Sequence, residues 1–460
     1  MMKRIERDFI GEMEIDDSCY YGIQTLRAIE NFPIGEQRLN DFPIFIDSIV
    51  IVKKAAALAN YELGLLEFEL KEAIIKACDK ILEGGYYSQF VVPMIQGGAG
   101  TSTNMNANEV IANIALEILG HKKGEYRFCH PNDHINKSQS TNDAYPTAMR
   151  LALYLRLGEL AESMDILNHS FTNKAKEFSD IVKMGRTQLQ DAVPMTLGQE
   201  FAAFALMLQK DRDRILHSRD EFKIINLGGT AIGTGINTPK KYKEIVEKKL
   251  QEITKIDFIT ARDLIEATQS TGAYVQISGI LKRAAVKLTK ICNDLRLLSS
   301  GPRAGINEIN LPKMQPGSSI MPGKVNPVIP EVVNQVCFLL IGSDTTITMA
   351  AAGGQLQLNV FEPVIIFSLL NSINLLQNAN ITLATKCIDG ITANKDICKH
   401  FVLNSIGLVT ALNPKIGYEK SAEVAKIALD SNRSIVEVVL EKGYLTKDEL
   451  DELLQIKNMI

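Results

Sequence analysis

Tryptophan is absent from this chain of 460 residues, and aromatic residues make up only 6% of it. Leucine, isoleucine, valine and alanine are abundant instead. Aromatic and β-branched side chains dominate β-sandwiches, whereas aliphatic side chains suit the packing of helices on helices. The composition therefore favours an all-α fold, and the length predicts two or three domains.

A strong excess of charge is also missing. The formal net charge is -4, with acidic and basic residues interspersed, so no surface for nucleic acid or for a membrane is indicated. The seven cysteines include no CxxC pair, and we expect buried free thiols, as in a reducing cytosol. The first residues, Met1 to Asp8, are charged and lack the apolar core of a signal peptide. These features predict a cytoplasmic protein.

Two motifs that superficially suggest ligands lack the residues that the chemistry requires. The run Gly228–Gly235 has no lysine after Gly233 and no GxGxxG spacing, so we expect a packing or turn role and no nucleotide. His130 and His134 are four residues apart, but the proline and asparagine between them disfavour a regular helix. We therefore predict hydrogen-bonding or surface histidines, not zinc ligands.

The helical pattern lengthens along the chain. Long helices are expected at 146–180, 196–222, 239–252, 262–299, 327–351 and 362–389. Several lack internal proline and exceed 25 residues, which is typical of an extended bundle. Val332–Ala352 contains polar residues, so it is expected to be a buried bundle helix and not a membrane span. We predict three domains: a mostly helical N-terminal domain (1–140), a central long-helix bundle (141–393) and a small helical C-terminal domain (394–460).

Six of the 15 prolines lie between residues 302 and 330, between two apolar helices. A long connection of this kind is usually functional or disordered. Gly317–Asn326 mixes apolar residues, paired serines and a lysine, so we interpret it as an ordered active-site loop.

Three further segments place small polar residues just ahead of an expected helix. They are Gly97–Thr103 before a helix at 106–119, Ser138–Asp143 before a helix opened by Pro146, and Gly185–Asp191 before Pro194. One such loop could be a simple helix cap. Four, one of them with a lysine, predict a metal-independent site for a small polyanion, because helix N-termini attract anions. Such donors suit removal of a proton next to a carboxylate, where negative charge accumulates.

The loop at 317–326 matches the GSSxMPxKxN signature of the fumarase/aspartase superfamily. The other three segments resemble the remaining active-site segments of that superfamily, in the same order and spacing. The resemblance covers residues 5 to 457. It implies a three-domain, all-α fold with a long central helical bundle, and release of fumarate by β-elimination.

Details resemble the aspartase branch more than class II fumarases. Fumarases usually carry Ser-Ser-Asn-Asp where Ser140-Thr141-Asn142-Asp143 stands, and His where Gln188 stands; a neutral amide cannot relay a proton as imidazole can. Some aspartases have His there too, and Gly323 is the residue that fumarases favour. The resemblance implies reversible deamination of L-aspartate to fumarate and ammonia, by anti β-elimination through an aci-carboxylate. A class II fumarase is the alternative, and a non-catalytic helical scaffold is the rival from another class.

The resemblance also implies a role for each site residue. Ser318 is the expected base that removes the Cβ proton. The β-carboxylate is expected to bind Thr101, Ser140, Thr141 and Ser319. The α-carboxylate is expected to bind Lys324, Asn326 and Thr187. Asn142 and Gln188 are expected to face the amino group.

Finally, the resemblance implies a homotetramer in which three chains contribute to each active site. No organic cofactor and no bound metal are expected to be required, and activation by a divalent metal, which some bacterial aspartases show, is left open.

Overall fold

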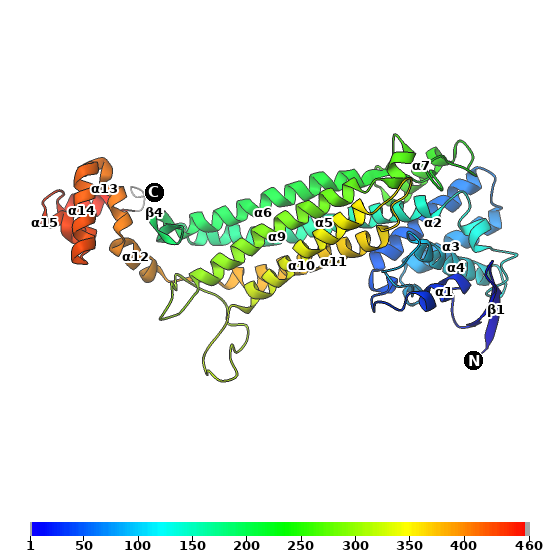
Figure 1. Cartoon of the computed structure of the whole chain (residues 1–460), viewed down its shortest axis with the longest axis horizontal. Coiled ribbons are helices and arrows are strands. Elements are labelled where there is room, and N and C mark those ends of the chain that lie inside the picture. The colour runs from blue at the N-terminus through cyan, green and yellow to red at the C-terminus, as the bar shows by residue number, and fades with distance from the viewer. Residues whose placement is uncertain (1, 456–460) are drawn as a thin grey trace. The chain divides into compact units, whose positions relative to one another are not determined.

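The computed structural model describes residues 2–455 (Figure 1). Helices dominate, which confirms the all-α prediction. They are α1 Ile23–Asn31, α2 Pro43–Glu62, α3 Phe68–Leu82, α4 Thr101–Ile118, α5 Thr141–Glu177, α6 Leu197–Arg219, α7 Tyr242–Thr254, α8 Leu264–Gln269, α9 Gly272–Leu298, α10 Val328–Ala352, α11 Glu362–Lys386, α12 Lys395–Asn404, α13 Val409–Ile416, α14 Tyr418–Ser431, α15 Ile435–Glu441 and α16 Lys447–Leu453.

The strands of the described residues form four two-stranded pairs. Three are antiparallel, and the pair β5–β6 is parallel. Their bounds are β1 Lys3–Arg7, β2 Glu12–Asp16, β3 Val182–Thr187, β4 Gln190–Thr196, β5 Ile224–Ile225, β6 Ile259–Thr260, β7 Ile309–Asn310 and β8 Thr392–Ala393.

The chain divides into two compact units, each made of several segments. Unit 1 contains Arg214–Lys282, Leu339–Leu375 and the described residues up to Ala161. Unit 2 contains Glu162–Asp213, Arg283–Phe338 and the described residues from Leu376 onward. The division falls within α5, α6, α9, α10 and α11, which are labelled in Figure 1. The predicted three-domain boundaries at 140 and 393 stay a prediction.

In unit 1, helices pack around buried aliphatic and aromatic side chains. Phe45 of α2 contacts the ring of Tyr145 of α5 edge to face, with centroids 5.4 Å apart. Ser278 of α9 donates from Oγ to Asp344 Oδ1 of α10 over 2.8 Å. Apolar burial stabilises such a core by about 25 cal/mol per Å², and the polar contacts fix which helix faces meet.

Unit 2 has an aromatic cluster between α5 and α6. Phe171 of α5 lies 5.9 Å from Phe201 and 5.8 Å from Phe204 of α6, measured between ring centroids. The C-terminal helices α12 to α15 lie together (Figure 1) and surround a hydrophobic core of their own, from Val402 to Leu450, to which Met184 of β3 also belongs.

Several expected helix boundaries were wrong: α4 begins at Thr101 and not at 106, and two further differences have a clear structural reason. The helix predicted at 262–299 is split into α8 and α9, because the chain leaves helical geometry at Ser270. The helix expected to open at Pro146 begins at Thr141 instead, so this proline lies inside α5. Proline cannot donate to the carbonyl four residues earlier; here that carbonyl, of Asn142, accepts from Asn226 Nδ2 over 2.9 Å. A side chain from elsewhere in unit 1 thus replaces the missing backbone donor.

Candidate active site

The first site segment runs over the ring of Tyr145 into the start of α4. Gly98, Ala99 and Gly100 all have positive φ, of 89°, 55° and 87°. A Cβ on Gly100 would lie 2.6 Å from the Tyr145 ring, so only glycine fits there. Thr101 is the first residue of α4 and is exposed. Its hydroxyl therefore lies beside helix-terminal N–H groups, an arrangement that attracts anions.

The second segment lies at the start of α5, and a hydrogen bond joins it to α4. Asn104 Nδ2 donates to Thr141 Oγ1 over 3.1 Å. A threonine hydroxyl has one hydrogen to donate and can accept as well. Because Thr141 accepts from Asn104, its own hydrogen remains for an oxygen of a ligand. The structure thus brings Thr101, Ser140, Thr141 and Asn142 together at two adjoining helix starts in unit 1. The sequence placed Thr101 and Thr141 in loops, but each is the first residue of its helix.

A buried lysine donates hydrogen bonds to the turn that leads into this second segment. Lys53 of α2 is fully buried, and its Nζ donates to Asn136 Oδ1 over 2.8 Å and to Gln139 Oε1 over 2.9 Å. Asn136 Oδ1 also accepts from Asn104 Nδ2 over 3.1 Å. Burial lowers the pKa of Lys53 to about 7. One amide oxygen thereby links α2, α4 and the turn that leads into Ser140.

Asp143 and the glycine-rich run at 228–235 also contact this segment. Asp143 Oδ2 accepts from the backbone N–H groups of Gly228 over 2.9 Å and Thr230 over 3.0 Å. Asn142 Nδ2 donates to the carbonyl of Ala231 over 2.7 Å. The predicted packing role of this run is confirmed, but the sequence did not show that it packs on the candidate site.

In unit 2, Thr187 and Gln188 lie at the tip of the β3–β4 hairpin, where the sequence predicted an irregular loop. Thr187 pairs with Gln190, so Gln188 and Leu189 form a two-residue turn. Both have positive φ, of 55° and 63°, as type I′ hairpin turns require. Neither is the glycine, asparagine or aspartate that such turns favour, and strained backbone of this kind is concentrated at functional sites. The side chains of Thr187 and Gln188 are both exposed.

A buried ion-pair network holds the base of this hairpin. Glu308 is fully buried, and its carboxylate lies 2.9 Å from Lys183 Nζ and 2.8 Å from Arg186 NH1. Both cations belong to β3. Removing one partner of a buried pair is strongly destabilising, so this network keeps the strand that ends at Thr187 in place. The sequence contained no signal for Glu308.

The Ser318 loop is closed by bonds between its own residues. The backbone N–H of Gly317 donates to the carbonyl of Lys324 over 2.8 Å, and Asn326 Nδ2 donates to the carbonyl of Gly317 over 2.8 Å. Ser318 Oγ accepts from the backbone N–H groups of Ile320 over 3.2 Å and Met321 over 3.0 Å. Hydrogen bonds of this kind favour a negatively charged oxygen. Ser319 and Lys324 are exposed.

The histidine pair makes hydrogen bonds, as predicted. His134 Nδ1 accepts from the backbone N–H of His130 over 2.8 Å, and His130 Nδ1 accepts from that of Asn132 over 3.1 Å. Among residues 2–455, no cluster of three or more histidine, cysteine, aspartate or glutamate side chains could hold a metal ion. The cysteines are free thiols, and six of the seven are buried.

The predicted site residues therefore fall into two groups. Unit 1 holds four of them, and unit 2 holds Thr187, Gln188, Ser318, Ser319, Lys324 and Asn326. The expected base and the residues expected to bind the α-carboxylate all belong to unit 2. The residues expected to bind the β-carboxylate and the amino group include members of each unit.

Comparisons with known proteins show the family of this chain. A family model described as lyase matches residues 11–342, and one described as fumarase C C-terminus matches 408–460. The chain is 65% identical to an aspartate ammonia-lyase of Helicobacter pylori, covering 99% of this chain and 98% of that protein. It is 57% identical to an aspartate ammonia-lyase of Escherichia coli, covering 99% and 96%.

Solved structures share the fold along the whole chain. A fumarate lyase:delta crystallin from Brucella melitensis, bound to cobalt, is 53% identical with a TM-score of 0.97, covering 100% of this chain and 99% of that one. A class II fumarase from Schistosoma mansoni is 35% identical with a TM-score of 0.93, covering 100% and 98%. This chain belongs to the lyase family that contains the aspartate ammonia-lyases and the class II fumarases.

Proposed function

We propose that this protein is an aspartate ammonia-lyase, which converts L-aspartate reversibly to fumarate and ammonia. The observation that carries the proposal is the Ser318 loop, in which two backbone N–H groups point at the serine oxygen. A serine hydroxyl is a poor base at neutral pH, and stabilisation of its alkoxide is what the reaction requires. The 57% to 65% identity to aspartate ammonia-lyases supports the choice of substrate.

The elimination proceeds in two steps. The Ser318 alkoxide takes a proton from Cβ, and the electron pair left behind moves into the β-carboxylate, which becomes a doubly charged aci-carboxylate. The pair then returns to form the Cα–Cβ double bond, and the C–N bond breaks so that the amino group leaves as ammonia. The proton held by Ser318 passes to solvent or to ammonia, which restores the alkoxide.

Hydroxyl groups carry the extra charge of the intermediate. Thr101, Ser140, Thr141 and Ser319 bind the β-carboxylate, and Thr141 has a hydrogen to donate because Asn104 occupies an acceptor position of its oxygen. Donors that strengthen as charge develops lower the barrier without binding the substrate more tightly.

Other polar groups hold the opposite end of the substrate. Lys324, Asn326 and Thr187 bind the α-carboxylate, and Lys324 supplies the positive charge. Asn142 and Gln188 face the amino group. Since the nitrogen of the Asn142 amide is bound to Ala231, its oxygen is the atom left to accept from an ammonium group.

These steps require no organic cofactor, because hydroxyl, amide and ammonium groups suffice to stabilise the intermediate. Activation by a divalent metal ion is a separate question. It is settled by assaying deamination with a chelator and with added magnesium.

The class II fumarase alternative differs in the molecule that is eliminated, which is water and not ammonia. Incubating the protein separately with L-aspartate and with malate, while following the ultraviolet absorbance of fumarate, separates the two. We expect fumarate from aspartate. Fumarate from malate alone would overturn the proposal, and fumarate from neither substrate would favour the non-catalytic scaffold.

We further propose a homotetramer with three subunits at each active site. Helix α10 supports this, because it is highly apolar yet only 28% of its most apolar window is buried within one chain. Val332, Phe338, Leu339 and Met349 are 44% to 71% exposed. The sequence predicted that this helix is buried. Other copies of the chain would have to cover its exposed apolar face for that prediction to hold. Both α10 and Glu362–Gly390 are long and apolar enough to cross a membrane, a test that bundle helices also pass.

Light scattering on the purified protein measures the assembly, and mixing inactive variants tests the sharing of sites. Ser318→Ala and Thr141→Ala place their defects in different segments. If sites are shared between subunits, mixed tetramers regain part of the activity, because some sites then contain neither substitution. We place the protein in the cytoplasm, where a reducing environment keeps its cysteines as thiols.

A further inference from the structure

Several hydrogen bonds next to Asn142 are made by residues that have no assigned role in the site. Asp143 is fully buried, and its two carboxylate oxygens accept from three backbone N–H groups. One is that of Ser140, over 2.8 Å to Oδ1. The others, of Gly228 and Thr230, belong to the glycine-rich run. One carboxylate therefore ties the run to the first turn of α5.

Asn226 forms a second tie between the same two segments. It is 1% exposed, and its Nδ2 donates to the backbone carbonyl of Asn142 over 2.9 Å and to Thr268 Oγ1 over 3.1 Å. The Asn142 carbonyl needs this donor, since Pro146 has no N–H to offer it. The side chain of Asn226, 84 residues away in the chain, thus fixes the backbone of Asn142.

Ala231 follows these two ties directly in the chain, and its carbonyl accepts from Asn142 Nδ2 over 2.7 Å. An asparagine amide can rotate by half a turn and exchange its donor and acceptor ends. A fixed carbonyl beside one end removes that freedom, because the opposite orientation would place two oxygens in contact. The position of Ala231 therefore decides that the oxygen of Asn142 is presented outward.

We propose that Asp143 and Asn226 are positioning residues of the ammonia subsite, on which the affinity of this site for ammonia depends. They hold the 226–231 segment against α5, so that Ala231 fixes the Asn142 amide with its oxygen toward the amino group. An oxygen there accepts an N–H of ammonia and leaves the nitrogen lone pair free to attack fumarate. The inference rests on the proposed function, because it assigns the ammonia subsite of that same reaction.

The test uses the reverse reaction, in which fumarate and ammonia bind as separate substrates. Asn226→Ala removes the tie to the Asn142 carbonyl and leaves Asp143 in place. We expect its KM for ammonia to rise about tenfold, the factor for one lost hydrogen bond, while its KM for fumarate stays within about threefold. KM values do not depend on how much of the protein is folded, so partial unfolding does not obscure the ratio.

Two further variants sharpen the test. Asp143→Asn places an N–H group against backbone N–H groups, and we expect a rise of the ammonia KM at least as large as that of Asn226→Ala. Thr268→Val is milder, because it removes only the second acceptor of Asn226. We expect it to raise the ammonia KM about twofold to threefold. It keeps the proposal testable if the other two variants fail to fold.

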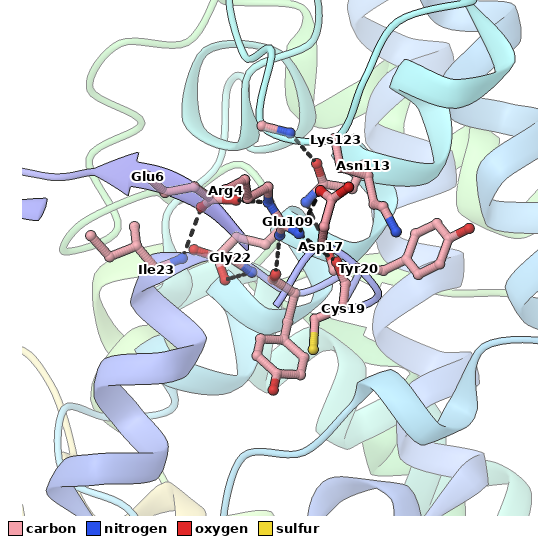
Figure 2. Close-up of polar contacts among 12 residues, drawn as sticks. Arg4, Glu6, Asp17, Cys19, Tyr20, Gly22, Ile23, Glu109, Asn113 and Lys123 are labelled. Atoms are coloured by element: carbon pink, nitrogen blue, oxygen red, sulfur yellow. Dashed lines mark hydrogen bonds and ion pairs between the residues drawn. The ribbon is translucent and has the colours of Figure 1, made fainter. Parts of the chain in front are cut away.

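Glu109→Gln is the matched control. Glu109 lies within α4 and is also a buried carboxylate that accepts from backbone N–H groups at a helix start, that of α1. Figure 2 shows it beside Gly22, whose backbone N–H donates to its Oε2 over 2.8 Å. It also accepts from the backbone N–H groups of Gln24 and Thr25, but not from residues 140–143 or 226–231. We expect Glu109→Gln to lower Tm and to leave the ratio of the two KM values unchanged.

Each result decides between the claims. If the wild-type protein hydrates fumarate and does not add ammonia, the proposed function fails. If it adds ammonia but the Asn226 and Thr268 variants leave both KM values unchanged, or raise both equally, only the positioning role is overturned. An equal change of the ratio in Glu109→Gln would also overturn it.

Discussion

The unit 1 site residues and the Ser318 loop of unit 2 differ in how far along the chain their hydrogen bonds reach. In unit 1, Thr141 is bound by Asn104, 37 residues away, and Asn142 is bound by Ala231, 89 residues away. In unit 2, the Ser318 loop is closed by bonds that span at most nine residues. The first arrangement is a pre-formed binding surface, and the second is a loop whose shape depends on little outside itself.

This difference suits the two tasks of the reaction. Stabilising an aci-carboxylate requires donors that are already oriented before the charge appears. A base must instead reach the substrate and then allow the product to leave, as loops that close over an active site do. Four predictions test the comparison, from the largest expected effect to the smallest.

Ser318→Ala removes the proposed base and keeps the hydrogen bonds of the Gly317 backbone to the Lys324 carbonyl and to the Asn326 side chain. We expect kcat for deamination to fall by about 1,000-fold or more, with Tm unchanged, because general bases contribute about 10² to 10⁴. Steady-state assays and thermal denaturation measure both. Ser319→Ala in the same loop is the control, with a loss of about tenfold. Wild-type turnover by Ser318→Ala would remove the base assignment.

Lys324→Met tests the charge of the same loop. Loss of the cation that is proposed to bind the α-carboxylate should lower kcat/KM for aspartate by about 100-fold. Lys313→Met, at another exposed lysine of this connection, should change it by less than about twofold. Similar losses in both variants would show that Lys324 acts only through the overall charge of the surface.

Gly100→Ala tests the rigid surface of unit 1. The substitution combines a positive φ with a Cβ 2.6 Å from the Tyr145 ring. We expect it to destabilise the protein by about 3 kcal/mol more than Gly120→Ala does, since overpacking adds to backbone strain. Gly120 has a similar φ of 82° but open space at its Cβ. Denaturant melts of both variants give the difference, and equal losses would mean that the loop can move off Tyr145.

Glu362→Gln tests a buried carboxyl group next to this surface. Burial raises the pKa of Glu362 from 4.5 to about 8, although Arg150 favours the carboxylate. The native state therefore keeps a proton that the unfolded state loses, so this contribution to stability is lost as the pH rises toward and through 8. Between about pH 6 and pH 8 we expect wild type to lose about 2 kcal/mol relative to Glu362→Gln. Tm measured across this range checks it, and parallel curves would contradict it.

The sequence predicted the long helices well because their apolar spacing extends over many turns. It was less accurate where distant residues intervene. Pro146 indicated a helix start, but Asn226 satisfies the carbonyl that proline leaves free, and α5 therefore begins at Thr141. The segment at 185–191 was expected to be a loop ahead of a helix, but it contains the tip of the β3–β4 hairpin. Gln188 and Leu189 are not residues that favour a tight hairpin turn, so the sequence did not indicate one.

The sequence by itself determined the helical class and indicated the segments of the candidate site, because helix periodicity and the spacing of small polar residues are local properties. Only the tertiary structure decided which atom of each side chain is available. Asn104 leaves the hydrogen of Thr141 free, and Ala231 leaves the oxygen of Asn142 free. Both partners lie far from these residues along the chain, and the direction of a hydrogen bond depends on where the fold places its donor.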